Sequence, residues 1–138
     1  MRPDGAYKVP TTPEEFFTKF LQYTEPLHGL SDKQIVLAAA FLAVRHRLSK
    51  KITDDELLDA NVLSTDMKRK ICNDLGMSRA NFRMLYGGLR KLGFIKDGRF
   101  NPKLIPNIAD VQKPKGFTLM FYFPFEYPNE QPGEETIQ

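Results

Sequence analysis

One stretch, residues 65–100, constrains the fold of this chain more than any other part of the sequence. Its first half has an apolar face that recurs every four residues and consists of Met67, Ile71 and Leu75. This spacing is typical of an amphipathic helix. Gly76 follows, and glycine can adopt without steric cost the left-handed conformation that ends a helix. Ser78 can then cap the start of a second helix. The pattern therefore predicts two helices joined by a tight turn.

The second predicted helix also has a single apolar face, and Gly93 ends it. This face consists of Phe82, Leu85, Leu89 and Leu92. Behind it, Phe94-Ile95 and Arg99-Phe100 flank Lys96-Asp97-Gly98. Asp-Gly between two apolar pairs is a strong signal for a β-hairpin turn. We therefore predict a short hairpin directly after the second helix.

This order of elements resembles the winged helix-turn-helix family of bacterial and phage DNA-binding proteins. The residues that carry the resemblance are Ile71, Leu75, Gly76, Ser78, Phe82, Leu85, Leu89, Leu92, Gly93 and Ile95. The resemblance is good over residues 65–100 and looser over residues 31–108. It implies a mainly α-helical fold with a small β wing. Most such domains bind DNA, but some serve only as protein–protein modules, so the fold alone does not decide the function.

Charge is concentrated in the same stretch. Residues 64–103 contain ten basic and three acidic residues, a net charge of +7, whereas the whole chain has a net charge of +3 and the remainder therefore −4. A basic block that coincides with a helix-turn-helix pattern is expected of a surface that binds phosphates. The alternative is that these charged helix faces are simply solvated.

The resemblance implies which of these residues would contact duplex DNA. Residues in the first turns of a recognition helix meet base edges, where arginine matches guanine and asparagine matches adenine. The candidates for base contacts are Arg79, Asn81 and Arg83. Candidates for contacts to the sugar–phosphate backbone, from the helices and the wing, are Lys68, Arg69, Lys70, Arg90, Lys91, Lys96 and Arg99.

Gly87-Gly88 departs from the family pattern, because it lies inside the predicted recognition helix. Each glycine costs a helix interior about 1 kcal/mol relative to alanine. Such a pair indicates either the close approach of another backbone or a kink. Met84 and Tyr86 nearby are also suited to packing on protein.

Three capping boxes predict the helices that precede this stretch. Thr12-Pro13-Glu14-Glu15 opens a helix rich in phenylalanine that should end at Pro26. Ser31-Asp32-Lys33-Gln34 opens a helix that should run to about Leu48 and has almost no polar face, which predicts the central buried helix. Thr53-Asp54-Asp55-Glu56 opens a short helix through Ala60, with Leu57 and Leu58 facing inward. The expected domain spans residues 12–110, preceded by an irregular arm, residues 1–11.

The C-terminal part of the chain contains the apolar stretch FTLMFYFPF, residues 117–125. We predict a strand or arm here, over residues 111–125. It could pair beside the wing, pack on the first helix, or complete a neighbouring subunit. Pro124 restricts a strand here to a sheet edge or a strand end. The candidate partner-binding residues are Phe117, Leu119, Phe121, Phe123 and Phe125. Residues 126–138 are expected to be an acidic tail.

Other classes of function find little support in the sequence. No nucleophile elbow, phosphate-binding loop or metal-ligand spacing is present, so we expect a protein that is not an enzyme and needs no cofactor or metal. The longest apolar run, Ile35–Val44, is too short to span a membrane. With no secretory signal pattern, we expect a cytoplasmic protein, or a virion component.

Two functions remain. The first is a winged-helix DNA-binding protein, such as a regulator or a replication or packaging factor. The second is a non-enzymatic assembly module, such as a phage virion or neck protein, in which the winged helix is a scaffold. The first predicts salt-sensitive binding to duplex DNA, and the second predicts a homo-oligomer or a larger assembly.

Overall fold

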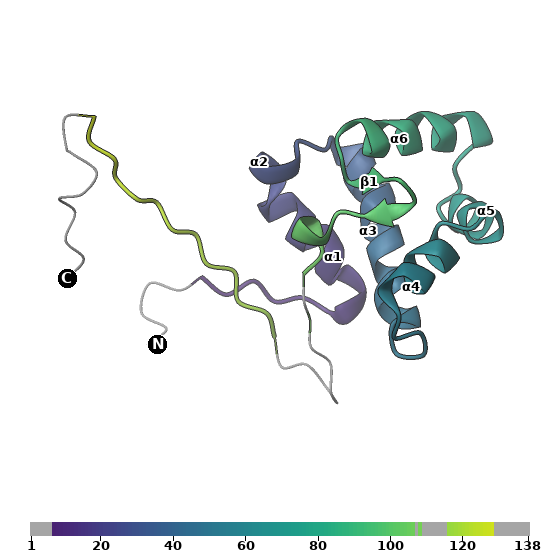
Figure 1. Cartoon of the computed structure of the whole chain (residues 1–138), viewed down its shortest axis with the longest axis horizontal. Coiled ribbons are helices and arrows are strands. Elements are labelled where there is room, and N and C mark those ends of the chain that lie inside the picture. The colour runs from purple at the N-terminus through teal and green to yellow at the C-terminus, as the bar shows by residue number, and fades with distance from the viewer. Residues whose placement is uncertain (1–6, 107, 109–115, 129–138) are drawn as a thin grey trace. The chain divides into compact units, whose positions relative to one another are not determined.

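The computed structural model describes residues 7–106, 108 and 116–128, and it divides into two units, Met1–Pro106 and Asn107–Gln138 (Figure 1). The described part of the first unit is mainly α-helical, with one two-stranded antiparallel sheet. The helices are α1 (Pro13–Tyr23), α2 (Glu25–His28), α3 (Asp32–Leu48), α4 (Asp55–Val62), α5 (Thr65–Asp74) and α6 (Arg79–Lys91). The strands are β1 (Ile95–Lys96) and β2 (Arg99–Phe100), followed by the 3₁₀ helix η1 (Pro102–Leu104).

Helix α3 is the centre of the first unit, and α1, α4 and α6 pack around it (Figure 1). Its capping box forms as predicted, because Ser31 accepts from the Gln34 amide and the Gln34 side chain accepts from the Ser31 amide. The Phe41 ring is fully buried and contacts Phe82, Tyr86 and Phe100. The prediction of a nearly all-apolar buried helix is correct except at Val36, which is exposed.

Helix α1 begins as predicted, with Thr12 accepting from the Glu15 amide and proline in the first turn. The predicted end at Pro26 is wrong. Helix α1 stops at Tyr23, and Pro26 lies inside the separate four-residue helix α2, where a proline in the first turn costs no hydrogen bond. His28 ends α2 and is buried. It accepts from the Leu30 amide and donates to the Leu21 carbonyl, so it joins α1 to the start of α3.

Helix α4 differs from its prediction in three respects. It ends at Val62 rather than Ala60. Asp54, rather than Thr53, is the N-cap, because its carboxylate accepts from the Leu57 amide. Leu58 is buried as predicted, but Leu57 is 53% exposed. Because consecutive residues are rotated by about 100° around a helix, the two leucines cannot both face the core. The buried face instead consists of Leu58, Asp59 and Val62.

The turn between α5 and α6 forms as predicted. Gly76 has a φ of 66°, in the left-handed region that ends a helix, and Ser78 accepts from the Asn81 amide to start α6. Leu85 and Leu89 are buried on α3, whereas Leu92 is 47% exposed, contrary to its predicted place on the apolar face. Leu92 is the C-cap residue, where the helical periodicity no longer applies.

The hairpin also forms as predicted. Ile95 pairs with Phe100 and Lys96 with Arg99, which leaves Asp97 and Gly98 as a two-residue loop. Both loop residues have positive φ, 54° and 72°, as a type I′ turn requires. Ile95 and Phe100 are buried on the side facing the helices.

In the second unit, the prediction was a strand or arm over residues 111–125, and the strand is wrong over the described residues 116–125; residues 111–115 lie outside the described residues. The described residues 116–128 form neither helix nor strand, and their large apolar side chains are exposed. Extended backbone counts as a strand only when a neighbouring strand takes its hydrogen bonds, and none does so here among the described residues. Residues 1–6 of the predicted arm and residues 129–138 of the predicted acidic tail lie outside the described residues.

Candidate nucleic-acid interface

Helices α5 and α6 enclose a groove of about 320 Å³ that combines positive charge with aromatic surface. The N-caps Ser64 and Ser78 fix where the two helices start, and Gly76 sets the turn between them. Four cations and two aromatic rings line the groove, together with polar residues and Cys72. The lining residues are Thr65, Lys68, Arg69, Cys72, Asn73, Arg79, Phe82, Arg83 and Tyr86.

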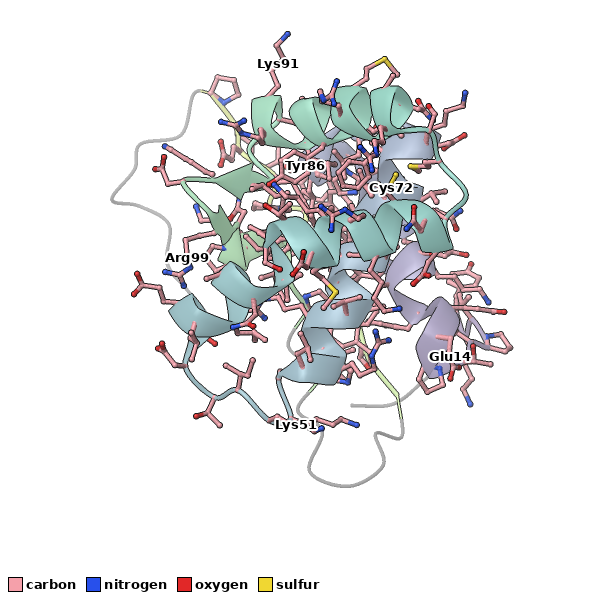
Figure 2. All side chains as sticks on the ribbon, turned by 90° about the vertical axis from the view of Figure 1, so that its right-hand side faces the viewer. Glu14, Lys51, Cys72, Tyr86, Lys91 and Arg99 are labelled. Atoms are coloured by element: carbon pink, nitrogen blue, oxygen red, sulfur yellow. The ribbon has the colours of Figure 1, made fainter. Side chains whose placement is uncertain are left out.

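Aromatic rings form one wall of this groove. Phe82 and Tyr86 lie one helical turn apart and are stacked, with ring centroids 5.8 Å apart and an interplanar angle of 11°. The Lys68 ammonium reaches across from α5 to within 4.8 Å of the Tyr86 ring centroid, a cation–π contact between the two helices. Figure 2 shows Tyr86 and Cys72 in the space between the two helices.

The Tyr86 hydroxyl is a hydrogen-bond donor at neutral pH. Burial raises the pKa of Tyr86 above its ordinary value, and the nearby charge of Arg90 lowers it by a smaller amount. The phenol therefore stays protonated, and it can donate to an acceptor such as a phosphate or base oxygen. Cys72 lies deeper, where its thiol donates to the Met77 carbonyl across 3.2 Å and supports the turn.

A second hollow of about 300 Å³ lies between α6 and the hairpin. It is lined by Gly87, Arg90, Lys91, Ile95, Lys96 and Asp97. A Cβ at Gly87 would meet no atom within 4 Å, so the helix surface is bare at this point. Arg79, Arg83, Gly87 and Arg90 follow one another at spacings of four, four and three, which places them on one face of α6. The two hollows therefore adjoin a single cationic face with a gap at Gly87.

The cations predicted to contact DNA differ in what they already contact. Five are exposed and have no carboxylate partner among the described residues: Arg79, Arg83, Arg90, Lys91 and Lys96. Arg69 is paired with Asp66 at 3.3 Å, and Lys70 with Asp74 at 3.1 Å. These pairs lie one turn apart on an exposed surface, so they are weak and can exchange for a phosphate.

Three predicted residues are placed apart from the hollows. Lys70 and Asn81 line neither of them, and Asn81 is half-buried in the first turn of α6. Arg99 points toward α4 instead, where its Nε donates to Asp59 at 2.9 Å, and this hydrogen bond raises the pKa of Arg99. In Figure 2, Lys91 points away from the body of the molecule, whereas Arg99 lies on the α4 side of the hairpin.

Asp59 is an important residue that the sequence analysis did not single out. Its side chain is 1% exposed, and its oxygens accept from Arg45 at 2.7 Å, Arg99 at 2.9 Å and the Phe100 amide at 3.2 Å. One carboxylate thus joins α3, α4 and β2. The sequence feature that could have indicated its burial is its position next to Leu58 and three residues before Val62, on the apolar face of the predicted helix.

The candidate partner-binding residues of the second unit are all exposed. Phe117 and Leu119 are 37% and 40% exposed, and Phe121, Phe123 and Phe125 are 53%, 76% and 83% exposed. The Phe121 and Phe123 rings stack on each other with centroids 6.4 Å apart. These side chains form a row of exposed apolar surface along this segment.

Among the described residues, no three histidine, cysteine or acidic side chains are grouped to hold a metal ion. None of the described helices combines the length and the apolar character needed to cross a bilayer. In comparisons with known proteins, no family model, curated protein or solved structure matches the chain.

Proposed function

We propose that this chain is a winged-helix protein that binds duplex DNA, with α5 and α6 as its helix-turn-helix and the β1–β2 hairpin as its wing. The observation that carries the proposal is the cationic face of α6. Arg79, Arg83 and Arg90 lie along one side of the helix, are exposed, and have no carboxylate partner among the described residues. Neutralising phosphates is a favourable use of such a face, because it releases the counterions condensed on DNA.

The two hollows support the same proposal. A helix that enters the major groove needs cations on both flanks to contact the phosphates of the two strands. Lys68 and Arg69 lie on the α5 flank, and Lys91 and Lys96 lie on the hairpin flank. The bare surface at Gly87 lets the edge of the DNA approach the helix backbone between them.

A salt titration of binding tests the proposal. In fluorescence anisotropy with a labelled random duplex, the double variant Arg79→Ala, Arg83→Ala should bind at least 10-fold more weakly at low salt. On a random duplex, which offers no preferred base sequence, Arg79 and Arg83 would act through phosphates rather than base edges. Each lost phosphate contact lowers the magnitude of the slope of log K against log salt by about 0.9, so two contacts lower it by about 1.8. If the slope and the affinity are unchanged, these arginines do not contact DNA and the proposal fails.

A matched control removes the same charge elsewhere. The double variant Arg47→Ala, Lys51→Ala changes the net charge equally, but at the C-terminal end of α3, and Figure 2 shows Lys51 at the end of the molecule opposite α6. At 0.1 M salt it should bind duplex DNA within about 2-fold of the unchanged chain, because charge effects beyond about 10 Å are screened at this ionic strength, and the two double variants are compared under that condition. An equal loss in both variants would mean that only net charge matters.

The second candidate function is an assembly module, and the exposed aromatic row of residues 117–125 favours it. Large exposed apolar patches are usually protein contact sites. This function requires a stable oligomer or a co-purifying partner that is lost when residues 117–138 are deleted. Oligomer formation without salt-dependent DNA binding would favour this function over the first.

A further inference from the structure

The groove between α5 and α6 carries positive charge that its own walls do not neutralise. Four of the side chains that line it are cationic and none is acidic. Among the described residues, only one of these cations has a carboxylate partner, Arg69, which pairs with the exposed Asp66. Arg79 and Arg83 are exposed and have none. A concave cationic site favours an anion, and guanidinium groups match phosphate oxygens in pairs.

The same groove has an aromatic wall that the core holds in place. Phe82 and Tyr86 stack on each other, and both rings contact the buried Phe41 ring of α3. Both are half-buried, so part of each ring borders the groove. The Tyr86 hydroxyl makes no hydrogen bond to any described residue. A ligand in the groove therefore meets a fixed aromatic surface and an unused donor (Figure 2).

Lys68 covers part of this aromatic wall, but it is not fixed there. Its ammonium lies 4.8 Å from the Tyr86 ring centroid and has no carboxylate partner among the described residues. Stacking of a nucleobase on an aromatic side chain is generally stronger than a cation–π contact at an exposed site. A base can therefore replace the ammonium on the ring, and the flexible stem of Lys68 lets its charge turn toward an anion beside the base.

We propose that the α5–α6 groove binds one nucleotide, with its base stacked on Tyr86 and its phosphate held by Lys68 and Arg83. Arg83 lies three residues before Tyr86 on α6, and side chains at this spacing are neighbours on a helix surface. The groove volume of about 320 Å³ is at the lower end of the range of small-molecule sites, about 300–1,000 Å³, which suits a single nucleotide.

Calorimetric titration of the full chain tests whether the groove needs both parts of the ligand. The probe is adenosine monophosphate, because every base has an aromatic face and any base can stack. It should bind saturably and about 10-fold more tightly than adenosine or inorganic phosphate, since it alone offers a base and a phosphate together. No saturable binding, or equal affinity for the nucleotide and either fragment, overturns the proposal.

A pair of lysine variants on α5 tests the position of the phosphate. Lys68→Met keeps an apolar side chain on the Tyr86 ring but removes the charge, so it should weaken binding of adenosine monophosphate by about 5-fold or more. The matched control is Lys70→Met, because Lys70 is paired with Asp74 and lines neither hollow. It should bind within about 2-fold of the unchanged chain. Equal effects in the two variants overturn the proposal.

A nuclear magnetic resonance titration of the unchanged chain places the base without any variant. The ring current of a stacked adenine should shift the ring protons of Tyr86 and Phe82, whereas inorganic phosphate should not shift them in this way. Shifts confined to residues outside the groove overturn the proposal.

A free nucleotide and an unpaired nucleotide within a nucleic-acid strand share this base and phosphate chemistry. The dinucleotide adenylyl-adenosine distinguishes the two sources, because its phosphate is a bridging diester rather than a terminal group. Tighter binding of the dinucleotide supports a strand as the ligand, and tighter binding of the mononucleotide supports a free nucleotide. None of these measurements contains duplex DNA, so their results are independent of the proposed duplex contacts.

Discussion

At the scale of single residues, Asp59 does more for the fold than any charged residue on the surface. It is buried and has three donors, two guanidinium groups and the Phe100 amide. The amide belongs to the outer edge of β2, where a third strand would otherwise pair. The Asp59 carboxylate on α4 therefore accepts the hydrogen bond of the Phe100 amide, which would otherwise be unpaired at the sheet edge. It also connects the hairpin to α3 through its ion pair with Arg45.

We predict that Asp59→Ala destabilises the chain severely. It leaves Arg45 and the Phe100 amide without a buried partner, and breaking one side of a buried ion pair costs about 3–5 kcal/mol. The free energy of unfolding from urea denaturation measures this. The control is Asp55→Ala, because Asp55 is 74% exposed and also pairs with Arg45, at 3.7 Å, and the loss of such a surface pair costs about 1 kcal/mol at most. Similar losses in the two variants would contradict the role of Asp59.

Tyr86 gives a second prediction at this scale. Burial raises its pKa, whereas Tyr7, Tyr23, Tyr122 and Tyr127 are well exposed. In an absorbance titration of phenolate, one component should therefore appear above about pH 10, the ordinary pKa of a tyrosine, and Tyr86→Phe should remove it. A titration of Tyr86→Phe that keeps the late component would show that another group produces it.

The same shift predicts how stability changes at alkaline pH. Because the folded-state pKa of Tyr86 is raised, the unfolded chain loses this proton first. The stabilising contribution is complete below the unfolded pKa, about 10, and is lost as the pH rises through the folded-state pKa. Tyr86→Phe should therefore lose less stability over this range than the unchanged chain, as measured by urea denaturation at pH 9 and pH 11.

At the scale of elements, the Gly87-Gly88 pair has a different cause from either of those suggested by the sequence. Helix α6 continues through both glycines, so they do not end it. Gly87 faces open space, whereas a Cβ at Gly88 would overlap the amide nitrogen of Gln34. What approaches closely is a side chain of α3, and it belongs to the capping box that starts α3. Gly88 therefore makes room for a helix cap.

We predict opposite results for alanine at the two positions. Gly87→Ala should stabilise the chain by up to about 1 kcal/mol, because it removes the helix cost of glycine. Gly88→Ala should bring no gain or a loss, because Gln34 must leave the capping box, and a cap is worth about 1 kcal/mol.

A double variant isolates the cause. In chains that carry Gln34→Ala, the overlap is absent, so Gly88→Ala should stabilise the chain as Gly87→Ala does. Unfolding free energies of the single and double variants complete the cycle. If Gly88→Ala is equally unfavourable with and without Gln34, the contact with the capping box is not the reason for the glycine.

At the scale of the whole molecule, positive charge gathers on one side of the fold. Residues 64–103 have a net charge of +7, and only some of their cationic side chains are paired with carboxylates. On α5, Arg69 and Lys70 have carboxylate partners one turn away, whereas the cations on the outer face of α6 have none among the described residues. The cations of the first unit that lack carboxylate partners among the described residues of 64–103 therefore include those of α6 and Lys96 of the hairpin, where the proposed DNA contacts lie.

Much of the local structure could be predicted from the sequence. The caps at Thr12, Ser31 and Ser78, the turn at Gly76 and the Asp97-Gly98 hairpin all formed as predicted. Each depends on a few neighbouring residues: a side-chain oxygen that meets an amide three residues later, or a position that needs positive φ. Such signals are local, so a single sequence is enough to predict them.

The errors occurred where distant residues decide the outcome. Leu57 and Leu92 are apolar but exposed, because which side of a short helix or a helix end is buried depends on where the neighbouring elements pack. Residues 117–125 have the composition of a strand, but a strand requires a partner, and no described part of this chain supplies one.

The sequence by itself therefore determined the helices, the turn, the hairpin and the concentration of positive charge, because hydrogen bonding and periodicity within short segments fix all of these. Only the tertiary structure decided which cations remain unpaired. In the folded chain Arg99 is hydrogen-bonded to Asp59, which lies 40 residues earlier in the sequence. Arg79, Arg83 and Arg90 remain exposed on α6. The physical reason is that a charge acts on its surroundings according to its neighbours in space, and packing around α3 sets those neighbours.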